Sequence, residues 1–398
     1  MLDIFKIFLV FTIILVLIRL KWNIGYVLLS ASGLLALLYL MPPQALFATI
    51  KSTLLDLTTI KLFFSLTLIR MLELILREKD ILKNMTDASR MMLKNKKAII
   101  ISMPLLIGML PSLGGAYFSA PMVDASTKGS KMTPEEKGFV NYWFRHPWEY
   151  ILPLYPGILL ASAITNLEIR KIISANMLYA VIIILTGFML SMRGIQAEKT
   201  KKREDRTNWK PLLSFLPILF ILIAVIVFHV ELHYALGIII LVLFVFYKYR
   251  GKDIFRVFQY GFTKDVIVLI FGTMLFKFTM EGSGAVAHLS QYFSEQGIPL
   301  LPILIILPFI SGILTGITVG FVGSSFPLLI NLANGAHLNE ITLAFASGFV
   351  GVLLSPVHLC LVLTKEYFKA DIWGIYKKTI PGCAMIMVGA LTLYIVLK

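Results

Sequence analysis

The amino-acid sequence predicts an all-α polytopic membrane protein, and two observations support this prediction. The 398-residue chain is 58% hydrophobic and 15% charged, whereas soluble domains carry about 45–50% apolar and about 25% charged residues. Apolar runs of about 20 residues, the length that crosses a bilayer, recur from end to end, and the mean hydropathy is +0.84. We therefore expect about ten transmembrane helices and two re-entrant hairpins.

The expected spans follow the apolar runs in order. The first run is followed by Arg19 and Lys21 and lacks a small-residue cleavage site, so we interpret it as a span and not as a signal peptide. Two further stretches, 98–121 and 299–330, are rich in Gly, Pro and Ser, which favours hairpins over plain helices. The predicted spans are residues 4–20, 22–40, 58–76, 136–164, 171–192, 211–229, 231–249, 265–282, 338–363 and 379–397.

The basic residues predict the orientation of the chain. Because basic loops stay in the cytoplasm, we expect a multi-pass protein of the cell membrane with its N-terminus outside. The net charge of +15 is then explained without nucleic-acid binding, and the two hairpins must enter from opposite faces. Most of the 37 Lys and Arg residues lie in the loops near residues 19–21, 77–97, 128–137, 193–210, 248–264 and 365–378.

An internal repeat divides the chain into two halves. Pro104 and Gly108 of the first Gly-rich stretch match Pro308 and Gly312 of the second, and a proline in each following span also matches. An odd number of crossings per half turns the second half upside down. This is the inverted-topology repeat found in many secondary transporters.

The predicted domain organisation follows this repeat. The first half, residues 1–192, contains scaffold spans within 1–80, a hairpin at 98–126, a broken span at 136–164 and a span at 171–192. The second half, residues 211–398, contains scaffold spans within 211–282, a hairpin at 299–330, a broken span at 338–363 and a span at 379–397. The basic segment 193–210 is the expected cytoplasmic linker between them.

The hairpin tips form the first candidate binding region. Backbone that is not helical is tolerated at membrane depth only inside protein or around a wet cavity. Helix N-termini that meet there favour an anion, and hydroxyl groups can bond a substrate oxygen or ligate Na⁺. The same hydroxyls can instead bond the carbonyls of their own helix. The candidate substrate-binding residues at the tips are Ser112, Gly114, Gly115, Ser119, Thr318, Gly320, Gly323, Ser324 and Ser325.

The segment NYWFRHPWEYILPLYPG (141–157) places three ionisable residues near the middle of a span. A charge at that depth is costly and by default marks a functional pathway. We expect Arg145 to bind an anionic substrate, and His146 or Glu149 to handle a coupling proton or ion. The alternative is an Arg145–Glu149 ion pair that repairs the helix break at Pro147 and never meets substrate.

The matching break in the second half is milder, because Ser355 and His358 flank Pro356 without a charged neighbour. Ser355 is a further candidate for substrate binding, and His358 for the coupling ion or proton. The alternative for His358 is a buried, hydrogen-bonded histidine.

Two charged pairs in other spans are expected to be structural. Arg70 with Glu73, and Lys277 with Glu281, stand at helical spacing and can neutralise each other.

Three motifs resemble those of a known family: LPSLGGAYFSAPMVDAS, NYWFRHPWEYILPLYPG and SPVHLCLVLTKEYF. They are similar to a prokaryotic integral-membrane family filed as domain of unknown function four hundred one. That family is grouped with the ion-transporter superfamily, beside gluconate permeases, citrate and dicarboxylate/sodium symporters and arsenite permeases. The resemblance implies two inverted repeats, substrate-binding hairpin tips, an elevator-type movement and a homodimer held by the scaffold helices. The sodium/dicarboxylate branch carries Ser-Asn-Thr at its tips, where this chain has Phe118-Ser119-Ala120 and Gly323-Ser324-Ser325.

The predicted function is secondary active transport of a small organic anion, a carboxylate in the first instance, driven by H⁺ or Na⁺. A channel is the main alternative. An intramembrane enzyme is disfavoured, and no catalytic residue is expected, because the chain lacks a His-Glu-x-x-His motif and a nucleophile elbow. Cys360 and Cys383 lie in or beside apolar segments, so we expect no disulfide. We also expect no metal site and no cofactor apart from Na⁺ as coupling ion.

Overall fold

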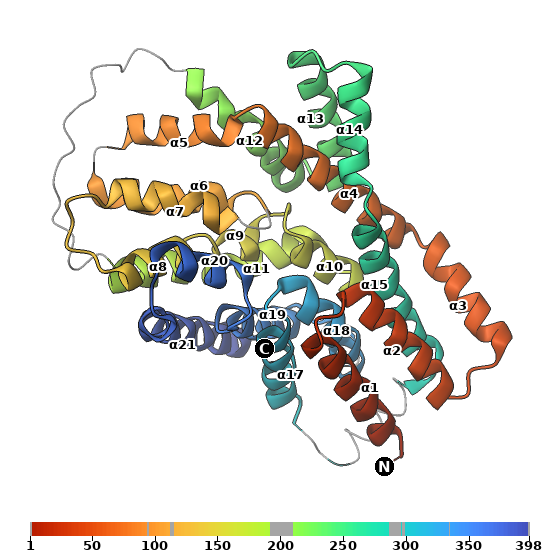
Figure 1. Ribbon diagram of the computed structural model, residues 1–398. Coiled ribbons are helices and arrows are strands. Elements are labelled where there is room, and N and C mark those ends of the chain that lie inside the picture. The colour runs from red at the N-terminus through yellow and green to blue at the C-terminus, as the bar shows by residue number, and fades with distance from the viewer. Residues whose placement is uncertain are drawn as a thin grey trace.

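The computed structural model is built of helices in the part of the chain that it describes (Figure 1). It describes residues 2–93, 95–111, 115–191, 210–285, 296, 299–333 and 335–396. Within these ranges there is no β-strand, which confirms the all-α class predicted from the sequence.

The first half of the chain contains both a helical hairpin and a broken helix. The hairpin is the pair α6–α7, and the broken span is α8–α9–α10. The helices are α1 (Leu2–Arg19), α2 (Ile24–Leu38), α3 (Pro43–Leu55), α4 (Leu57–Glu78), α5 (Ile81–Met92), α6 (Lys96–Gly108), α7 (Gly115–Ser126), α8 (Pro134–Trp143), α9 (Trp148–Ile151), α10 (Pro156–Thr165) and α11 (Ile169–Ser191).

The second half has the same two features, in the hairpin α17–α18 and the broken helix α19–α20. The predicted span at 379–397 begins earlier than expected, because α21 starts at Ile372. The elements are η1 (Lys210–Phe215), α12 (Leu216–Leu222), the π-helix η2 (Ile223–Val227), α13 (Leu232–Phe246), α14 (Gly251–Gly261), α15 (Lys264–Gly282), α17 (Leu300–Thr315), α18 (Thr318–Leu332), α19 (Leu338–Leu353), α20 (Leu359–Phe368) and α21 (Ile372–Val396).

Three helices were not predicted: α3, and α5 and α14, which lie where the sequence suggested basic loops. In α14, Val257 and Gly261 are buried and the helix packs on α4, whereas Lys252 and Arg256 are exposed. The basic residues of this segment suggested a loop, so its helical pattern of buried and exposed residues was missed in the sequence. A helix with one apolar and one basic face is typical of a segment that lies along a membrane surface.

The helices of the two halves correspond in order. Helices α1 to α4 match α12 to α15, and the hairpin and broken helix follow in each half. Packing between the halves is reciprocal: α2 packs on α15 and α13 on α4, while α10 packs on α18 and α20 on α7. Reciprocal contacts are the mark of two similar units related by a two-fold axis. The opposite orientation of the halves in a membrane stays a prediction.

Two of the described helices, α11 and α21, are long and apolar enough to cross a membrane. The other apolar helices, among them α2, α13, α17, α18 and α19, have 10–17 residues. Large apolar side chains stand exposed on several helices. Examples on α13 are Val245, which is 80% exposed, and Phe246, which is 71% exposed.

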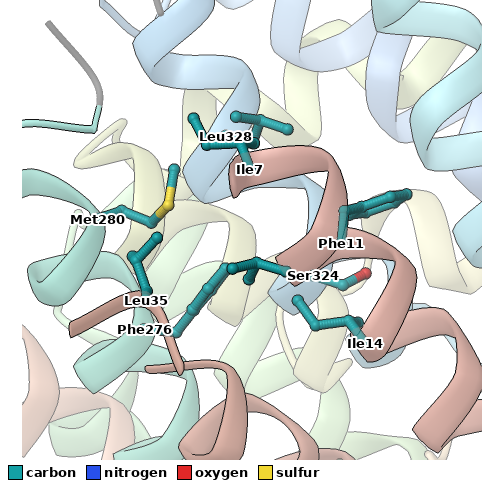
Figure 2. A pocket seen from close by; sticks show the side chains of 9 residues that line it. Ile7, Phe11, Ile14, Leu35, Phe276, Met280, Ser324 and Leu328 are labelled. Carbon is teal, nitrogen blue, oxygen red and sulfur yellow. The ribbon is translucent and has the colours of Figure 1, made fainter. Parts of the chain in front are cut away.

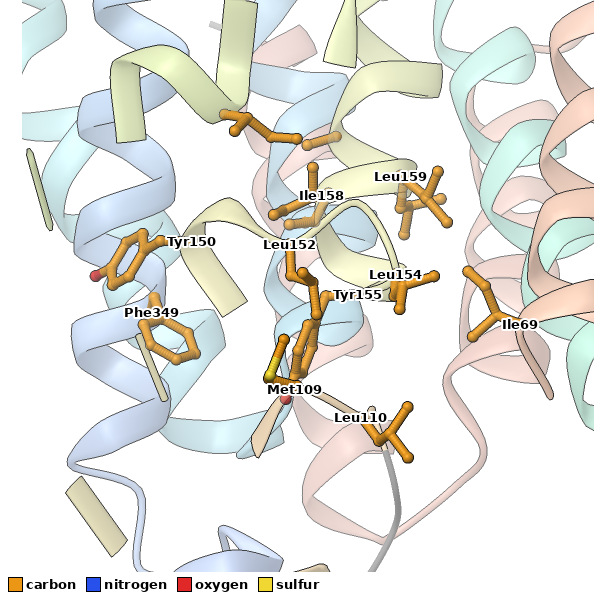
Figure 3. Close-up of a cluster of buried hydrophobic side chains, with 14 of the residues drawn as sticks. Ile69, Met109, Leu110, Tyr150, Leu152, Leu154, Tyr155, Ile158, Leu159 and Phe349 are labelled. Carbon is orange, nitrogen blue, oxygen red and sulfur yellow. The ribbon is translucent and has the colours of Figure 1, made fainter. Parts of the chain in front are cut away.

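The main hydrophobic core encloses the break in the first half (Figure 3). Leu152 and Leu154 of the non-helical segment are buried there, between Ile69 of α4 and Phe349 of α19. The rings of Tyr150 and Phe349 meet edge to face with centroids 4.8 Å apart. The non-helical backbone of the break is thus packed inside protein.

Candidate functional site

The first wall of the site is the break between α8 and α10. Helix α8 ends at Trp143, and Pro147 lies in the turn that follows, where it cannot donate a backbone hydrogen bond. Helix α10 starts afresh with Pro156 in its first turn. The end of α8 is anchored by Tyr142, whose hydroxyl donates to the carbonyl of Leu353 at 2.9 Å. The two breaks are therefore tied together.

The second wall is the break between α19 and α20. Helix α19 ends at Leu353 and α20 begins at Leu359, with Pro356 between them. The fully buried Ser355 donates to the carbonyl of Ile313 in α17 at 2.6 Å. This candidate for substrate binding therefore fastens the break to the hairpin.

Two histidines from opposite halves of the chain meet between these walls. The Nε2 atoms of His146 and His358 are 3.0 Å apart. The Nδ1 atom of His146 lies 2.6 Å from the carbonyl oxygen of Tyr142, and that of His358 lies 2.5 Å from the carbonyl oxygen of Gly316. Both rings are buried. The structure thus brings together two residues that the sequence assigned to the coupling ion, although they are far apart in the chain.

Glu149 joins this group through one of its carboxylate oxygens. Oε1 lies 3.9 Å from His146 Nε2, and Oε2 accepts a hydrogen bond from the hydroxyl of Thr318 at the start of α18. The carboxylate therefore links the broken helix to the second hairpin. It is not bonded to Arg145, so the ion pair considered as an alternative is not formed among the described residues.

Arg145 is buried without satisfying its donors. Its side chain is 4% exposed, and Nε and Nη1 have no hydrogen-bond partner among the described residues. A buried charge without partners costs several kcal/mol, of order 3–5 when one member of a pair is missing. An unsatisfied guanidinium at a helix break is the arrangement expected of a group that receives an anionic ligand.

Cys360 completes the cluster and was not predicted from the sequence. One donor atom each from His146, His358 and Cys360 all lie within 4.8 Å of one another. The sequence showed no metal-ligand spacing, because the first histidine is remote from the His358-x-Cys360 pair. One signal in the sequence could have found the cluster. Pro147 matches Pro356 in the repeat, so the residues beside the two prolines are expected to lie near the axis that relates the two halves.

Two glycines that correspond in the repeat allow the close packing around the site. A Cβ on Gly108 of α6 would collide with the backbone carbonyl of Arg145, and a Cβ on Gly312 of α17 would collide with that of Gly348. The hydroxyl of Tyr155 also donates to the carbonyl of Gly108. Gly316 adopts a positive φ of 64°, a conformation that glycine reaches without strain, and so presents its carbonyl to His358.

Most hydroxyls of the second hairpin bond to their own helix. Ser324 donates to the carbonyl of Gly320 at 2.7 Å, and Ser325 to that of Phe321 at 2.6 Å. Gly323 faces Leu28 of α2 and Thr273 of α15. This is the back-bonding considered for these residues. Thr318 alone among the hydroxyl candidates of this hairpin reaches the central cluster.

The first hairpin is held by a polar network around Asn141, a residue that the sequence analysis missed. Ser119 donates to Asn141 Oδ1 at 2.6 Å. The amide of Asn141 donates to the carbonyl of Ala116 at 3.1 Å and to the hydroxyl of Thr364 at 2.8 Å. Gly115, the first residue of α7, is buried beside them. Ser112 and Gly114 lie outside the described residues.

A separate pocket lies among α1, α2, α15 and α18 (Figure 2). It encloses about 250 Å³ including open space, and its lining is apolar except for Ser324. Because the Ser324 hydroxyl already bonds to Gly320 and no charged residue lines the pocket, this space does not suit an anion.

The two charged pairs in the scaffold spans do not form the expected direct ion pairs. Arg70 Nε donates to the carbonyl of Tyr260 at 3.2 Å, with the guanidinium 4.9 Å from the centre of that ring. Lys277 Nζ points to the carbonyl of Ala163 near the end of α10, at 3.5 Å. In the described part of the chain, the charges of each pair still interact at longer range, while the basic groups make their direct contacts with backbone carbonyls and a ring.

Comparison with known proteins bears on the family alone. No curated protein matches the chain. A family model described as "Protein of unknown function (DUF401)" matches residues 4–397, nearly the whole length. The three motifs that carried the resemblance lie within this range, at the first hairpin and at both breaks. The chain is a member of the DUF401 family.

Proposed function

We propose that this protein is a membrane-embedded secondary active transporter of a small organic anion, a carboxylate in the first instance, driven by H⁺ or Na⁺. The elevator-type movement implied by the resemblance to the ion-transporter superfamily belongs to this proposal. So do the plasma-membrane location, the outside N-terminus and the homodimer held by scaffold helices.

Exposed apolar surface supports the membrane location. Helices α11 and α21 are long enough to span a bilayer. Large apolar side chains are exposed along α13, including Ile238, Leu241 and Val245. Water-soluble monomers rarely expose contiguous apolar patches of this kind. A bilayer would cover them.

The observation that carries the anion proposal is the state of Arg145. Its guanidinium is buried beside a helix break, and the carboxylate nearest in sequence, Glu149, is bonded elsewhere. Planar bidentate donors of this kind suit a carboxylate. A substrate carboxylate that accepts from either free nitrogen would supply the missing counter-charge and offset the cost of the buried guanidinium.

The reciprocal packing of the two halves supports alternating access. The breaks and hairpins of both halves gather at one place, while α2–α15 and α4–α13 pack together elsewhere. A site at the junction of two inverted units can open to either side through movement of one group of helices against the other. This arrangement favours a carrier over a channel.

The test is uptake of radiolabelled carboxylates by proteoliposomes, under an inward Na⁺ gradient or an inward pH gradient. We expect saturable uptake with counterflow under one of the two gradients. Arg145→Gln should reduce uptake at least about 100-fold, in line with the loss of a charged hydrogen-bonded contact worth about 3 kcal/mol. Arg170→Gln is the matched control, because the side chain of Arg170 is 38% exposed and, among the described residues, pairs with Glu168 just before α11. Uptake that does not saturate would favour the channel, and normal uptake by Arg145→Gln would remove Arg145 from the substrate site.

A further inference from the structure

When both rings are neutral, the facing Nε2 atoms of His146 and His358 have no hydrogen-bond donor between them, and the transport proposal does not account for this. A carbonyl oxygen can only accept a hydrogen bond, so the Nδ1 atoms of His146 and His358, at 2.6 and 2.5 Å from carbonyl oxygens, must both carry hydrogen. In the neutral rings the two Nε2 atoms then have lone pairs that face each other across 3.0 Å. These lone pairs repel unless a cation lies between them.

A third donor converges on the same point. Cys360 Sγ lies with the two histidine nitrogens in a group whose donor atoms are all within 4.8 Å of one another. The sulfur also lies within hydrogen-bonding reach of both rings, and a thiol has one hydrogen, which it can donate to only one of the two nitrogens. Two imidazoles and a thiolate are the ligands that borderline-soft ions such as Zn²⁺ select.

We propose that His146 Nε2, His358 Nε2 and Cys360 Sγ bind a divalent ion of the Zn²⁺ class between the two helix breaks. With metal–nitrogen bonds of about 2.0–2.1 Å, two nitrogens of a tetrahedral site stand about 3.3 Å apart. The observed 3.0 Å requires the rings to separate by about 0.3 Å, a small movement for two side chains.

The surroundings of the three ligands match those of bound metals. Histidine ligands almost always donate their second ring nitrogen to a carbonyl or carboxylate, which fixes the tautomer. Tyr142 and Gly316 supply these carbonyls. The positive φ of Gly316 turns its carbonyl toward the ring, so the second half of the site depends on that glycine.

Glu149 lies next to the group of three ligand atoms, on the side of His146. Its Oε1 atom lies 3.9 Å from His146 Nε2, and Thr318 holds its other oxygen. The thiolate and this carboxylate together balance the charge of a divalent ion, which leaves Arg145 as the excess positive charge. The site is built from α8–α9 of one half and α20 of the other, so the ion joins the two helix breaks.

The metal site does not depend on the transport proposal, and binding alone tests it. The protein is purified in detergent, stripped with a chelator and titrated with Co²⁺, followed by Zn²⁺ competition and metal analysis. We expect one ion per chain, a near-ultraviolet thiolate-to-Co²⁺ charge-transfer band, and visible bands typical of four-coordinate Co²⁺. Cys360→Ser should lose the near-ultraviolet band and bind more than about 100-fold more weakly, beyond the loss caused by removal of an outer partner.

The second cysteine provides the matched control. Cys383 is buried, lies on α21 and is not part of the cluster, so Cys383→Ser should bind Co²⁺ with the wild-type spectrum. If Cys360→Ser does not fold, the spectra of wild type and Cys383→Ser still decide, because the band in the control can come only from Cys360. Folded wild-type protein that takes up no Co²⁺, or binding without the charge-transfer band, would overturn the proposal and leave a shared proton between the histidines.

Discussion

At the scale of single residues, two buried asparagines differ in whether their side chains are hydrogen-bonded. Asn141 of α8 makes three hydrogen bonds, to Ser119, Ala116 and Thr364, and so joins α7, α8 and α20. Asn176 of α11 is equally buried, yet neither its Nδ2 nor its Oδ1 atom has a partner among the described residues. A buried polar group stabilises a fold only when it is bonded, and otherwise costs its desolvation.

The two asparagines should therefore respond in opposite ways to the same substitution. Asn141→Leu removes three hydrogen bonds in a buried site, and we expect it to destabilise the protein by about 2–4 kcal/mol. Asn176→Leu removes an unsatisfied amide and should be neutral or stabilising. Thermal unfolding in detergent, followed by circular dichroism, measures both. Equal losses in the two variants would show that side-chain volume, and not hydrogen bonding, governs these positions.

At the scale of elements, the helix breaks depend on how closely the hairpins approach them. Gly108 of α6 and Gly312 of α17 sit against backbone carbonyls of the broken helices, with no room for a Cβ. Gly33 of α2 and Gly237 of α13 have no atom within 4 Å of a Cβ position. The four glycines lie inside helices or at a helix end, and differ in what they face.

Alanine substitution at these four glycines should separate packing from helix propensity. We expect Gly108→Ala and Gly312→Ala to destabilise by about 1–3 kcal/mol, because the added methyl group forces the helices apart. Gly33→Ala and Gly237→Ala should stabilise by up to about 1 kcal/mol through better helix propensity. The melting temperature in detergent is the readout, and a gain at Gly108 would contradict the close contact with Arg145.

Elements of the fold were predictable from the sequence wherever a local physical rule acts. Prolines 147 and 356 predicted both breaks, since neither residue can donate a backbone hydrogen bond. Helices α5 and α14 were missed, because their basic residues suggested loops. The cluster was predicted only in part. His146 and His358 were predicted as separate candidates, whereas Cys360 was noted only as a cysteine in or beside an apolar segment. The role of Cys360 depends on which helices pack together, and this packing cannot be read from the order of residues in the chain.

At the scale of the whole molecule, the reciprocal packing of the halves makes the orientation of each half testable. The connection between α1 and α2 corresponds to that between α12 and α13. If the halves are inverted, these two connections lie on opposite sides of the membrane. Arg19 and Glu231 are exposed residues at the two positions, and the positive-inside rule places Arg19 in the cytoplasm.

Cysteine labelling in intact cells tests this arrangement. An impermeant maleimide should label Glu231→Cys but not Arg19→Cys, and permeabilised cells should show labelling of both. The loss of the Lys61–Glu231 ion pair is tolerable, because both partners are nearly half exposed and such pairs contribute about 0–1 kcal/mol. The two native cysteines are buried or partly buried and serve as the background. Labelling of both variants from outside would mean that the halves are parallel.

The central cluster also bears on how such a chain arises. His146 and Glu149 come from one half, whereas His358 and Cys360 come from the other, and no half holds the full set. The two halves therefore supply different groups to one cluster. Because both breaks contribute to one cluster, a substitution at one break changes the surroundings of the residues at the other. Compensating substitutions should therefore accumulate in pairs that are 212 positions apart in the sequence.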